Sequence, residues 1–266
     1  MRLSAAGGMA LATGLLVALS PSCTRLAPAQ HPTAAPRTDH RAVELSAQPV
    51  APDPRVGAVF LGGSSLHSCT GGVLDSPGGN LIITAAHCVA EGVDTVFVSG
   101  FNNGAAPANA WHVDAVYLDP RWVASQDPLA DFAIARVSRG SGGTVQAQAG
   151  GGLTLRPAPK PGTVITVSGY GLGVGGGPVG CRTATAPNTR GFPSLACAGL
   201  VDGLSGAPWI DGSTVTGVIG GLDGGGCDDK RSFSPPFDDS VTRVLARAEA
   251  AGPGDAAPTT STDTCS

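Results

Sequence analysis

The chain has 266 residues, a net charge of −4 and 14% charged residues, against roughly 25% in ordinary soluble domains. This length accommodates one large all-β domain or two small ones. Nucleic-acid binding usually depends on a basic patch, and the acidic balance offers none, so we expect no nucleic-acid partner. Glycine (40) and proline (22) are abundant, which favours many turns and few amphipathic helices.

The N-terminus has the pattern of an export signal. A positively charged start is followed by an apolar run over residues 10–19, and Ala27-Pro28-Ala29 places small residues where a signal peptidase cleaves. The run is shorter than the roughly 20 apolar residues that a membrane span needs. We therefore expect a signal peptide over residues 1–29, no membrane span and a secreted, extracellular protein. Lipid anchoring at Cys23 ranks second, because the three residues before it match a lipidation signal poorly.

Strand patterns dominate the chain from residue 54 onward. Residues 30–53, rich in proline, alanine and isolated charges, indicate a disordered propeptide or linker before them. Short apolar or alternating runs then recur about every ten residues between turn-forming residues, as in a sandwich or barrel. The expected strands are 56–61, 69–74, 81–84, 95–99, 111–117, 163–170 and 215–220.

A glycine-rich connector divides this strand-bearing sequence. It covers residues 138–152, so we expect an N-terminal β unit over 54–150 and a C-terminal β unit over 151–252. One helix is predicted near the end of the second unit, followed by a flexible tail over 253–266. Its apolar residues recur at helical spacing: Val241, Val244, Leu245 and Ala248.

Three segments carry a base, a carboxylate and a nucleophile, in that order. His87 stands in Thr-Ala-Ala-His-Cys (84–88), Asp131 precedes an apolar run, and Ser205 stands in Gly-Leu-Ser-Gly-Ala-Pro (203–208). A serine hydroxyl is inert near neutral pH until an imidazole removes its proton, and a carboxylate orients that imidazole. The order excludes the α/β-hydrolases, whose histidine follows the serine, because every histidine here precedes Ser205.

Over roughly residues 54–248 these segments resemble the trypsin/chymotrypsin-like serine proteases. The resemblance implies an all-β fold of two antiparallel six-stranded β-barrels with a C-terminal helix. It also implies a serine endopeptidase in which His87 is the base, Asp131 orients it and Ser205 attacks the peptide carbonyl. The amides of Gly203 and Ser205 would form the oxyanion hole. Such an enzyme needs no metal and no cofactor; its partners would be protein or peptide substrates, with a proteinaceous inhibitor as a further candidate.

Each catalytic assignment has an alternative. A lone histidine such as His87 is usually a core or surface residue, and Ser205 alone would suit a glycine-rich turn. Asp127 competes with Asp131, but it precedes a proline on an expected loop, whereas Asp131 borders an apolar strand that would bury its carboxylate. For the whole chain, the alternative is a catalytically weak or inactive protease-fold binding protein.

The cysteines indicate disulfides. Six of the 7 remain once the expected signal is removed, an even number in an exported chain, and no Cys-x-x-Cys pair points to zinc. Val201 replaces a cysteine common in the family, which leaves Cys227 without its usual partner and makes Cys265 a candidate. The resemblance implies two pairs: Cys69–Cys88 and Cys181–Cys197.

The chain departs from trypsin-like enzymes just before the nucleophile. Leu204 replaces an aspartate that would pair with a buried N-terminal amine, so we predict that no buried N-terminus forms the oxyanion loop. Together with the opening strand 56–61, this resembles the glutamyl-endopeptidase branch. For substrate binding, the resemblance implies roles for Gly199 and for the edge formed by Gly220, Gly221 and Leu222, where substrate backbone would pair. No side-chain preference is predicted.

Overall fold

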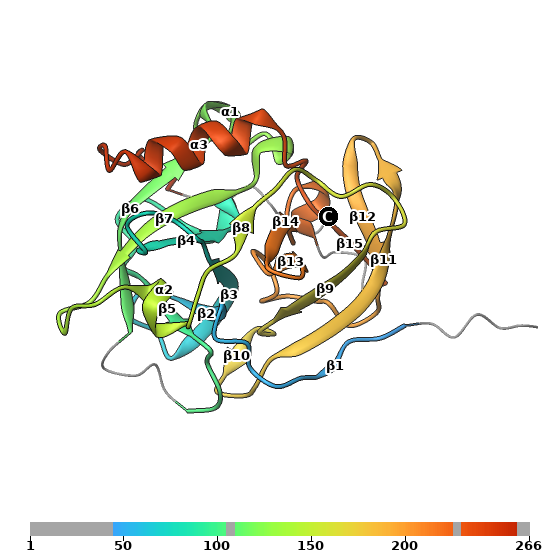
Figure 1. Ribbon diagram of the computed structural model, residues 1–266, viewed down its shortest axis with the longest axis horizontal. Coiled ribbons are helices and arrows are strands. Elements are labelled where there is room, and N and C mark those ends of the chain that lie inside the picture. The colour runs from blue at the N-terminus through green and yellow to red at the C-terminus, as the bar shows by residue number, and fades with distance from the viewer. Residues whose placement is uncertain (1–44, 105–109, 226–229, 260–266) are drawn as a thin grey trace, which may run out of the picture. The chain divides into compact units, whose positions relative to one another are not determined.

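The described residues form two β-sheets whose main strands follow one another along the chain, apart from β1 (Gln48–Pro49) and β10 (Gly173–Val174), which each pair with the other sheet (Figure 1). The computed structural model describes residues 45–104, 110–225 and 230–259, all of which belong to one unit over residues 43–266. The expected signal peptide, the anchoring alternative at Cys23 and the cysteines Cys227 and Cys265 lie outside the described residues.

Among the described residues, six strands of the first sheet close into a ring that we call the first barrel. Its ladder runs β3-β2-β5-β6-β7-β4 and returns from β4 to β3, with antiparallel pairing throughout. Strand β4 is buried along its whole length because its alternating side chains pack into two different apolar clusters, Leu81 and Ile83 into one and Ile82 into the other. The strands are β2 (Val56–Leu61), β3 (Leu66–Val73), β4 (Leu81–Thr84), β5 (Thr95–Ser99), β6 (Trp111–Leu118) and β7 (Ala133–Ser138).

Six further strands of the described chain make the second barrel, in the order β15-β12-β11-β9-β13-β14. Its two ends meet where the Gly220 amide donates to the Phe233 carbonyl at 3.1 Å. The predicted all-β fold is confirmed. Outside the six barrel strands, β8 (Thr154–Leu155) pairs with β14 in parallel. The strands are β9 (Val164–Gly169), β11 (Val179–Thr189), β12 (Phe192–Ala196), β13 (Pro208–Asp211), β14 (Thr214–Val218) and β15 (Arg231–Phe233).

The C-terminal helix is present, and it lies against the first barrel. Helix α3 (Asp239–Glu249) begins after Asp238, whose side chain accepts a hydrogen bond from the Ser240 amide, and it contacts β6 and β7. Within the described residues no helix is both long and apolar enough to cross a membrane. The shorter helices are α1 (Pro120–Ser125), α2 (Val145–Gln148), η1 (Ala86–Cys88), η2 (Pro128–Ala130) and η3 (Leu222–Gly225).

The segment before the first barrel is bound to the second barrel. Of residues 30–53, which we expected to be a disordered propeptide or linker, the structure describes 45–53, and there β1 (Gln48–Pro49) pairs antiparallel with β11. Just before it, the Ala47 amide donates to the Ala198 carbonyl at 2.8 Å. Sequence composition gave no sign of this pairing, because backbone groups at a sheet edge form it without apolar side chains. We call residues 45–50 the N-terminal strap.

The start of the expected flexible tail is also held. The Asp255 amide donates to the Val116 carbonyl at 2.7 Å, and the Asp255 carboxylate accepts the Leu118 amide at 2.7 Å. Arg247 of α3 forms an ion pair with the same carboxylate. One acidic side chain thus fixes residues 253–257 along β6, a contact that a polar, small-residue composition does not reveal.

Candidate active site

His87 lies on a turn that a disulfide joins to the neighbouring strand. It is the central residue of η1, which follows β4, and its neighbour Cys88 is bonded to Cys69 of β3. By the loop-entropy estimate a disulfide of this span contributes about 3 kcal/mol, and here it also limits the movement of the turn. The expected second pair, Cys181–Cys197, is bonded as well and joins β11 to the residue after β12.

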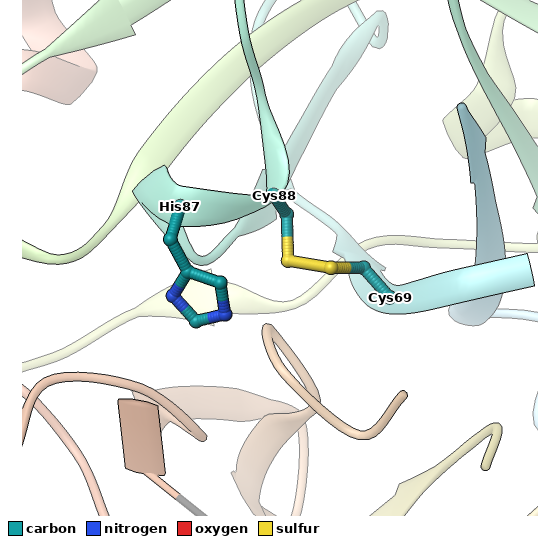
Figure 2. Close-up of side chains that lie close together, drawn as sticks. All are labelled: Cys69, His87 and Cys88. Atoms are coloured by element: carbon teal, nitrogen blue, oxygen red, sulfur yellow. A yellow bond between two sulfur atoms is a disulfide. The ribbon is translucent and has the colours of Figure 1, made fainter. Parts of the chain in front are cut away.

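Figure 2 shows the His87 imidazole beside this disulfide. One ring nitrogen of His87 and the sulfurs of Cys69 and Cys88 all lie within 4.8 Å of one another, close enough to share a metal ion. Both sulfurs are joined in the disulfide, however, and a thiolate is the form of cysteine that ligates metals. In its oxidised form this cluster therefore does not fit a metal site.

The carboxylate of Asp131 holds His87 at two points. Its Oδ1 accepts the His87 amide at 3.0 Å, and its Oδ2 lies 2.8 Å from His87 Nδ1. Oδ2 also accepts the Gly221 amide at 2.7 Å. A carboxylate only accepts hydrogen bonds, so the hydrogen of a neutral His87 ring is on Nδ1. Asp131 thus selects both the orientation and the tautomer of the imidazole.

Asp131 is completely buried, with 0% of its side chain exposed. Burial alone would raise the pKa of this carboxyl, but the positive charge of His87 and the hydrogen bonds from His87 and Gly221 lower it further. The net effect is a pKa below the ordinary value of an aspartate, so Asp131 is ionised at neutral pH.

Asp127, the alternative carboxylate, has a different role. It precedes η2, and its side chain accepts the Leu129 amide at 3.0 Å as the cap of that short helix. The turn that follows places Asp131 in the interior, two residues before the start of β7. The apolar run after Asp131 was therefore a correct indication of burial.

Ser205 lies on a loop that tight packing constrains to glycine at both sides. Gly203 has φ +92°, and a Cβ there would lie 2.1 Å from the Leu172 nitrogen. Gly206 has φ +81°, and a Cβ there would lie 2.2 Å from the Thr70 carbonyl oxygen. Between them Leu204 is fully buried in the apolar core of the second barrel and anchors the loop.

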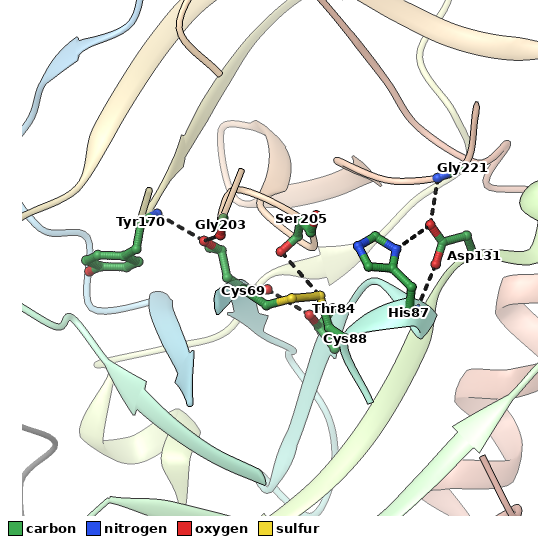
Figure 3. The surroundings of a disulfide bond; sticks show 10 residues. Cys69, Thr84, His87, Cys88, Asp131, Tyr170, Gly203, Ser205 and Gly221 are labelled. Atoms are coloured by element: carbon green, nitrogen blue, oxygen red, sulfur yellow. Dashed lines mark hydrogen bonds and ion pairs between the residues drawn. A yellow bond between two sulfur atoms is a disulfide. The ribbon is translucent and has the colours of Figure 1, made fainter. Parts of the chain in front are cut away.

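Ser205 and His87 meet across the two barrels. The Ser205 carbonyl oxygen lies 3.7 Å from Cys88 Sγ and accepts the Thr70 amide at 2.8 Å. Figure 3 shows the imidazole of His87 between Asp131 and Ser205. Folding thus brings the three predicted residues together although they come from three separate segments.

The amides of Gly203 and Ser205 were the predicted oxyanion donors. Neither donates to an acceptor in the part of the chain that the structure describes, whereas the next amide, of Gly206, donates to the Ile219 carbonyl at 2.7 Å. An amide turned away from protein acceptors is available to a ligand, because buried backbone donors otherwise find partners within the fold.

The predicted substrate-binding residues lie in two places: Gly220 and Gly221 lie against Asp131, whereas Gly199 lies near the N-terminal strap. Gly220 packs against Asp131, since a Cβ there would lie 2.8 Å from Oδ2, and the amides of Gly220 and Gly221 are used within the protein. Backbone pairing with a substrate would therefore fall on the Gly220 carbonyl and on Leu222, which begins η3. Gly199 lies near the N-terminal strap, where a Cβ would be 3.7 Å from Ala47.

Sequence reasoning missed Thr70, which supports the loop of Ser205. Its hydroxyl donates to the Gly203 carbonyl and accepts the Tyr170 amide, each at 3.0 Å. Its own carbonyl accepts the hydroxyl of Thr84 at 2.7 Å. A threonine after a cysteine on a strand carries no chemical signal, so only the fold reveals this role.

Comparison with known proteins agrees with the geometry. A two-barrel fold with a buried His–Asp pair beside a glycine-flanked serine defines the trypsin-like class. A sequence model of that family, described as Trypsin, matches residues 46–245, so the chain belongs to the trypsin family. Among curated proteins, no sequence matches it significantly.

Solved structures share the fold at low sequence identity. The protease Anisep from Arthrobacter nicotinovorans is 22% identical (TM-score 0.66) over 77% of this chain and 99% of its own. A Glu endopeptidase is 18% identical (TM-score 0.61), with 78% and 98% covered. Human heparin binding protein is 16% identical (TM-score 0.60), with 80% and 100% covered. At these identities the likeness establishes the fold alone.

Proposed function

We propose that this protein is a secreted serine endopeptidase. The observation that carries the proposal is the buried Asp131 carboxylate on Nδ1 of His87, with Ser205 on the other side of the imidazole (Figure 3). Membership of the trypsin family supports a hydrolase that cleaves peptide bonds. The disulfides support an oxidising, extracytoplasmic location.

The reaction follows from the tautomer that Asp131 selects. With hydrogen on Nδ1, the lone pair of the ring is on Nε2, where it takes the proton of the Ser205 hydroxyl. Oγ of Ser205 then bonds to the peptide carbonyl carbon, and the carbonyl oxygen becomes an oxyanion near the Gly203 and Ser205 amides. Asp131 stabilises the imidazolium of His87 that forms.

Two further steps complete turnover. His87 returns the proton to the leaving nitrogen, the carbon–nitrogen bond breaks, and the acyl group stays on Ser205. A water molecule then gives a proton to the same imidazole and attacks the ester, which releases the acid and restores the hydroxyl. His87, Asp131 and Ser205 are thus assigned as base, orienting acid and nucleophile.

The experiment that tests this proposal is cleavage profiling on a denatured proteome, with Ser205→Ala as the matched control. The proposal requires new peptide termini in the wild-type digest that are absent from the control digest. Identical digests would instead favour a protease-fold protein that binds without turnover.

A further inference from the structure

The turn that carries His87 has little internal support. Its two backbone hydrogen bonds, to the carbonyls of Ala85 and Ala86, are each 3.2 Å long, and no described side chain caps its N-terminus. Hydrogen bonds in such short turns have poorer geometry than those of an α-helix. The Cys69–Cys88 disulfide fixes the end of the turn, so packing at Ala86 has to fix its start.

One buried apolar cluster contains the neighbours of both His87 and Asp131. Ala86 directly precedes His87, Ala130 directly precedes Asp131, and both alanines are 0% exposed. Ala257 belongs to the same cluster and is only 8% exposed, although it comes from the expected flexible tail. Close-packed interiors resist changes of volume, so each member restricts the movement of the others. The last described part of the chain thus shares its packing with the proposed base and its orienting acid.

Ala257 is held in this cluster because the residues before it are bonded to β6 and to the loop after η1. We call residues 253–257 the C-terminal segment. The Asp255 carboxylate accepts the Leu118 amide of β6 at 2.7 Å, and the Ala257 amide donates to the Glu91 carboxylate at 3.2 Å. Glu91 lies in the loop that follows η1, so the C-terminal segment bridges that loop and β6.

The attachment point on β6 is paired with the strands that lead to the candidate active site. Leu118 pairs with Ala133 of β7, which pairs on its other side with Thr84 of β4. At these three residues β4 and β6 end and β7 begins. Asp131 is two residues before Ala133, and His87 is three residues after Thr84. We therefore expect a displacement at Leu118 to affect both members of the pair.

We propose that the C-terminal segment positions the His87–Asp131 pair for the reaction. Docked on β6, it completes the apolar cluster that contains the residue before each of them. Asp255 and Ala257 are positioning residues, which act through the pair and touch no substrate. This inference rests on the proposed endopeptidase function and adds a distant part of the chain to it. A misplacement of about 1 Å can cost about 10²-fold in rate, so even a partial displacement is measurable.

The test compares the same substitution at two glycines that lie two residues apart. A Cβ at Gly254 would lie 3.0 Å from both the nitrogen and the carbonyl oxygen of Val116, whereas a Cβ at Gly252 has nothing within 4 Å. Gly254→Val should therefore displace the C-terminal segment from β6, and Gly252→Val is the matched control. At a temperature where circular dichroism shows both variants folded, kcat on a peptide should fall about 10-fold in Gly254→Val only, with KM unchanged.

A spectroscopic measurement separates positioning from general stability. The proton on His87 Nδ1 is hydrogen-bonded to Asp131, and such protons give a far-downfield resonance in proton NMR. This resonance should be sharp in wild type and in Gly252→Val, and broadened by faster exchange with water in Gly254→Val. A lower melting temperature with an unchanged resonance and an unchanged kcat would overturn the inference, because the segment would then act on stability alone.

A second pair of variants applies if Gly254→Val does not fold. Asp255→Ala removes the acceptor of the Leu118 amide and the ion pair with Arg247, whereas Asp255→Asn keeps an acceptor oxygen for that amide. We expect Asp255→Ala to lose kcat and the His87 resonance as described above, and Asp255→Asn to recover most of both. Wild-type kcat and resonance in Asp255→Ala would overturn the inference.

The resonance also tests the inference without turnover. In the Ser205→Ala protein, adding Gly254→Val should broaden the His87 resonance, whereas adding Gly252→Val should leave it sharp. An unchanged resonance would refute the positioning role even if the wild-type protein hydrolyses peptides. A broadened resonance in a protein whose wild type shows no turnover would refute only the proposed function.

Discussion

At the scale of single residues, Asp131 organises the candidate active site. One oxygen accepts the His87 amide, and the other accepts both His87 Nδ1 and the Gly221 amide. The carboxylate is thus bonded on both oxygens, and it fixes the backbone as well as the ring of the proposed base. A side chain of this kind acts on catalysis through the histidine that it orients.

Asp131→Asn therefore removes the selection of the tautomer while preserving the side chain's shape. An amide can donate to Nδ1, which places the ring hydrogen on Nε2, where it cannot accept the Ser205 proton. We expect kcat to fall by about 10⁴-fold, with KM little changed. The measurement is steady-state hydrolysis of a peptide substrate, and Asp127→Asn is the control; equal losses in both variants would contradict the assignment.

The lowered pKa of Asp131 also predicts an acid-dependent stability. Because the folded pKa lies below the unfolded one, the ionised carboxylate stabilises the fold above the unfolded pKa of about 3.9. That contribution is lost as the pH falls from there through the folded pKa. Urea unfolding from pH 6 to pH 2 should give a shallower pH dependence of the unfolding free energy in Asp131→Asn. Parallel curves for the two proteins would refute this.

The glycine after Ser205 gives a third prediction. Gly206→Ala places a Cβ at positive φ and 2.2 Å from the Thr70 carbonyl, so we expect a loss of about 2–4 kcal/mol of unfolding free energy. Gly212→Ala is the matched control: φ is +60°, nothing lies within 4 Å, and the expected cost is about 1 kcal/mol. Denaturant titration compares them, and equal costs would rule out the close contact.

The local motifs explain how much of the site could be predicted. His87 and Ser205 stand in recognisable segments, and the apolar run after Asp131 distinguished it from Asp127. The support from Thr70 and Gly221 could not be predicted, because both act through backbone contacts with residues far away in sequence.

At the scale of elements, strands with apolar runs were predictable, and strands of small polar residues were not. The bounds of β2, β4 and β5 agree with the expected 56–61, 81–84 and 95–99. Strand β11 was missed because threonine and cysteine occupy its buried positions. Strand β12 has a proline within it, which argues against a strand from sequence alone.

The N-terminal strap leads to a prediction about chain length. A chain starting at Leu45 keeps β1 and the contact between Ala47 and Ala198, so it should be as stable as one starting at Gln30. A chain starting at Val56 loses both and should melt several degrees lower. Thermal unfolding measures this.

The first two of these chains, which start at Gln30 and Leu45, also test the role of Leu204. Because Leu204 anchors its loop through apolar burial, the chains starting at Gln30 and Leu45 should hydrolyse a peptide equally fast. A chain that is inactive with residues 30–44 and becomes active when they are trimmed would show that a new N-terminus is required.

At the scale of the whole molecule, the barrels exchange segments. The N-terminal strap reaches the second barrel, β10 pairs with β3 of the first, and α3 packs on β6 and β7. These crossings place His87 and Asp131 from the first barrel against the Ser205 loop of the second. Sequence order predicted two β units, but nothing local in it predicts which segments cross, since the crossings are made largely by backbone pairing.

The most direct test asks whether His87 of the first barrel activates Ser205 of the second. The measurement is stoichiometric labelling with a fluorophosphonate, with the labelled residue located by peptide mass spectrometry. We predict one equivalent of label on Ser205, and at least a 10³-fold slower reaction in His87→Ala with the fold preserved. An unlabelled Ser205 in folded protein, or labelling that proceeds equally fast without the imidazole, would contradict the account.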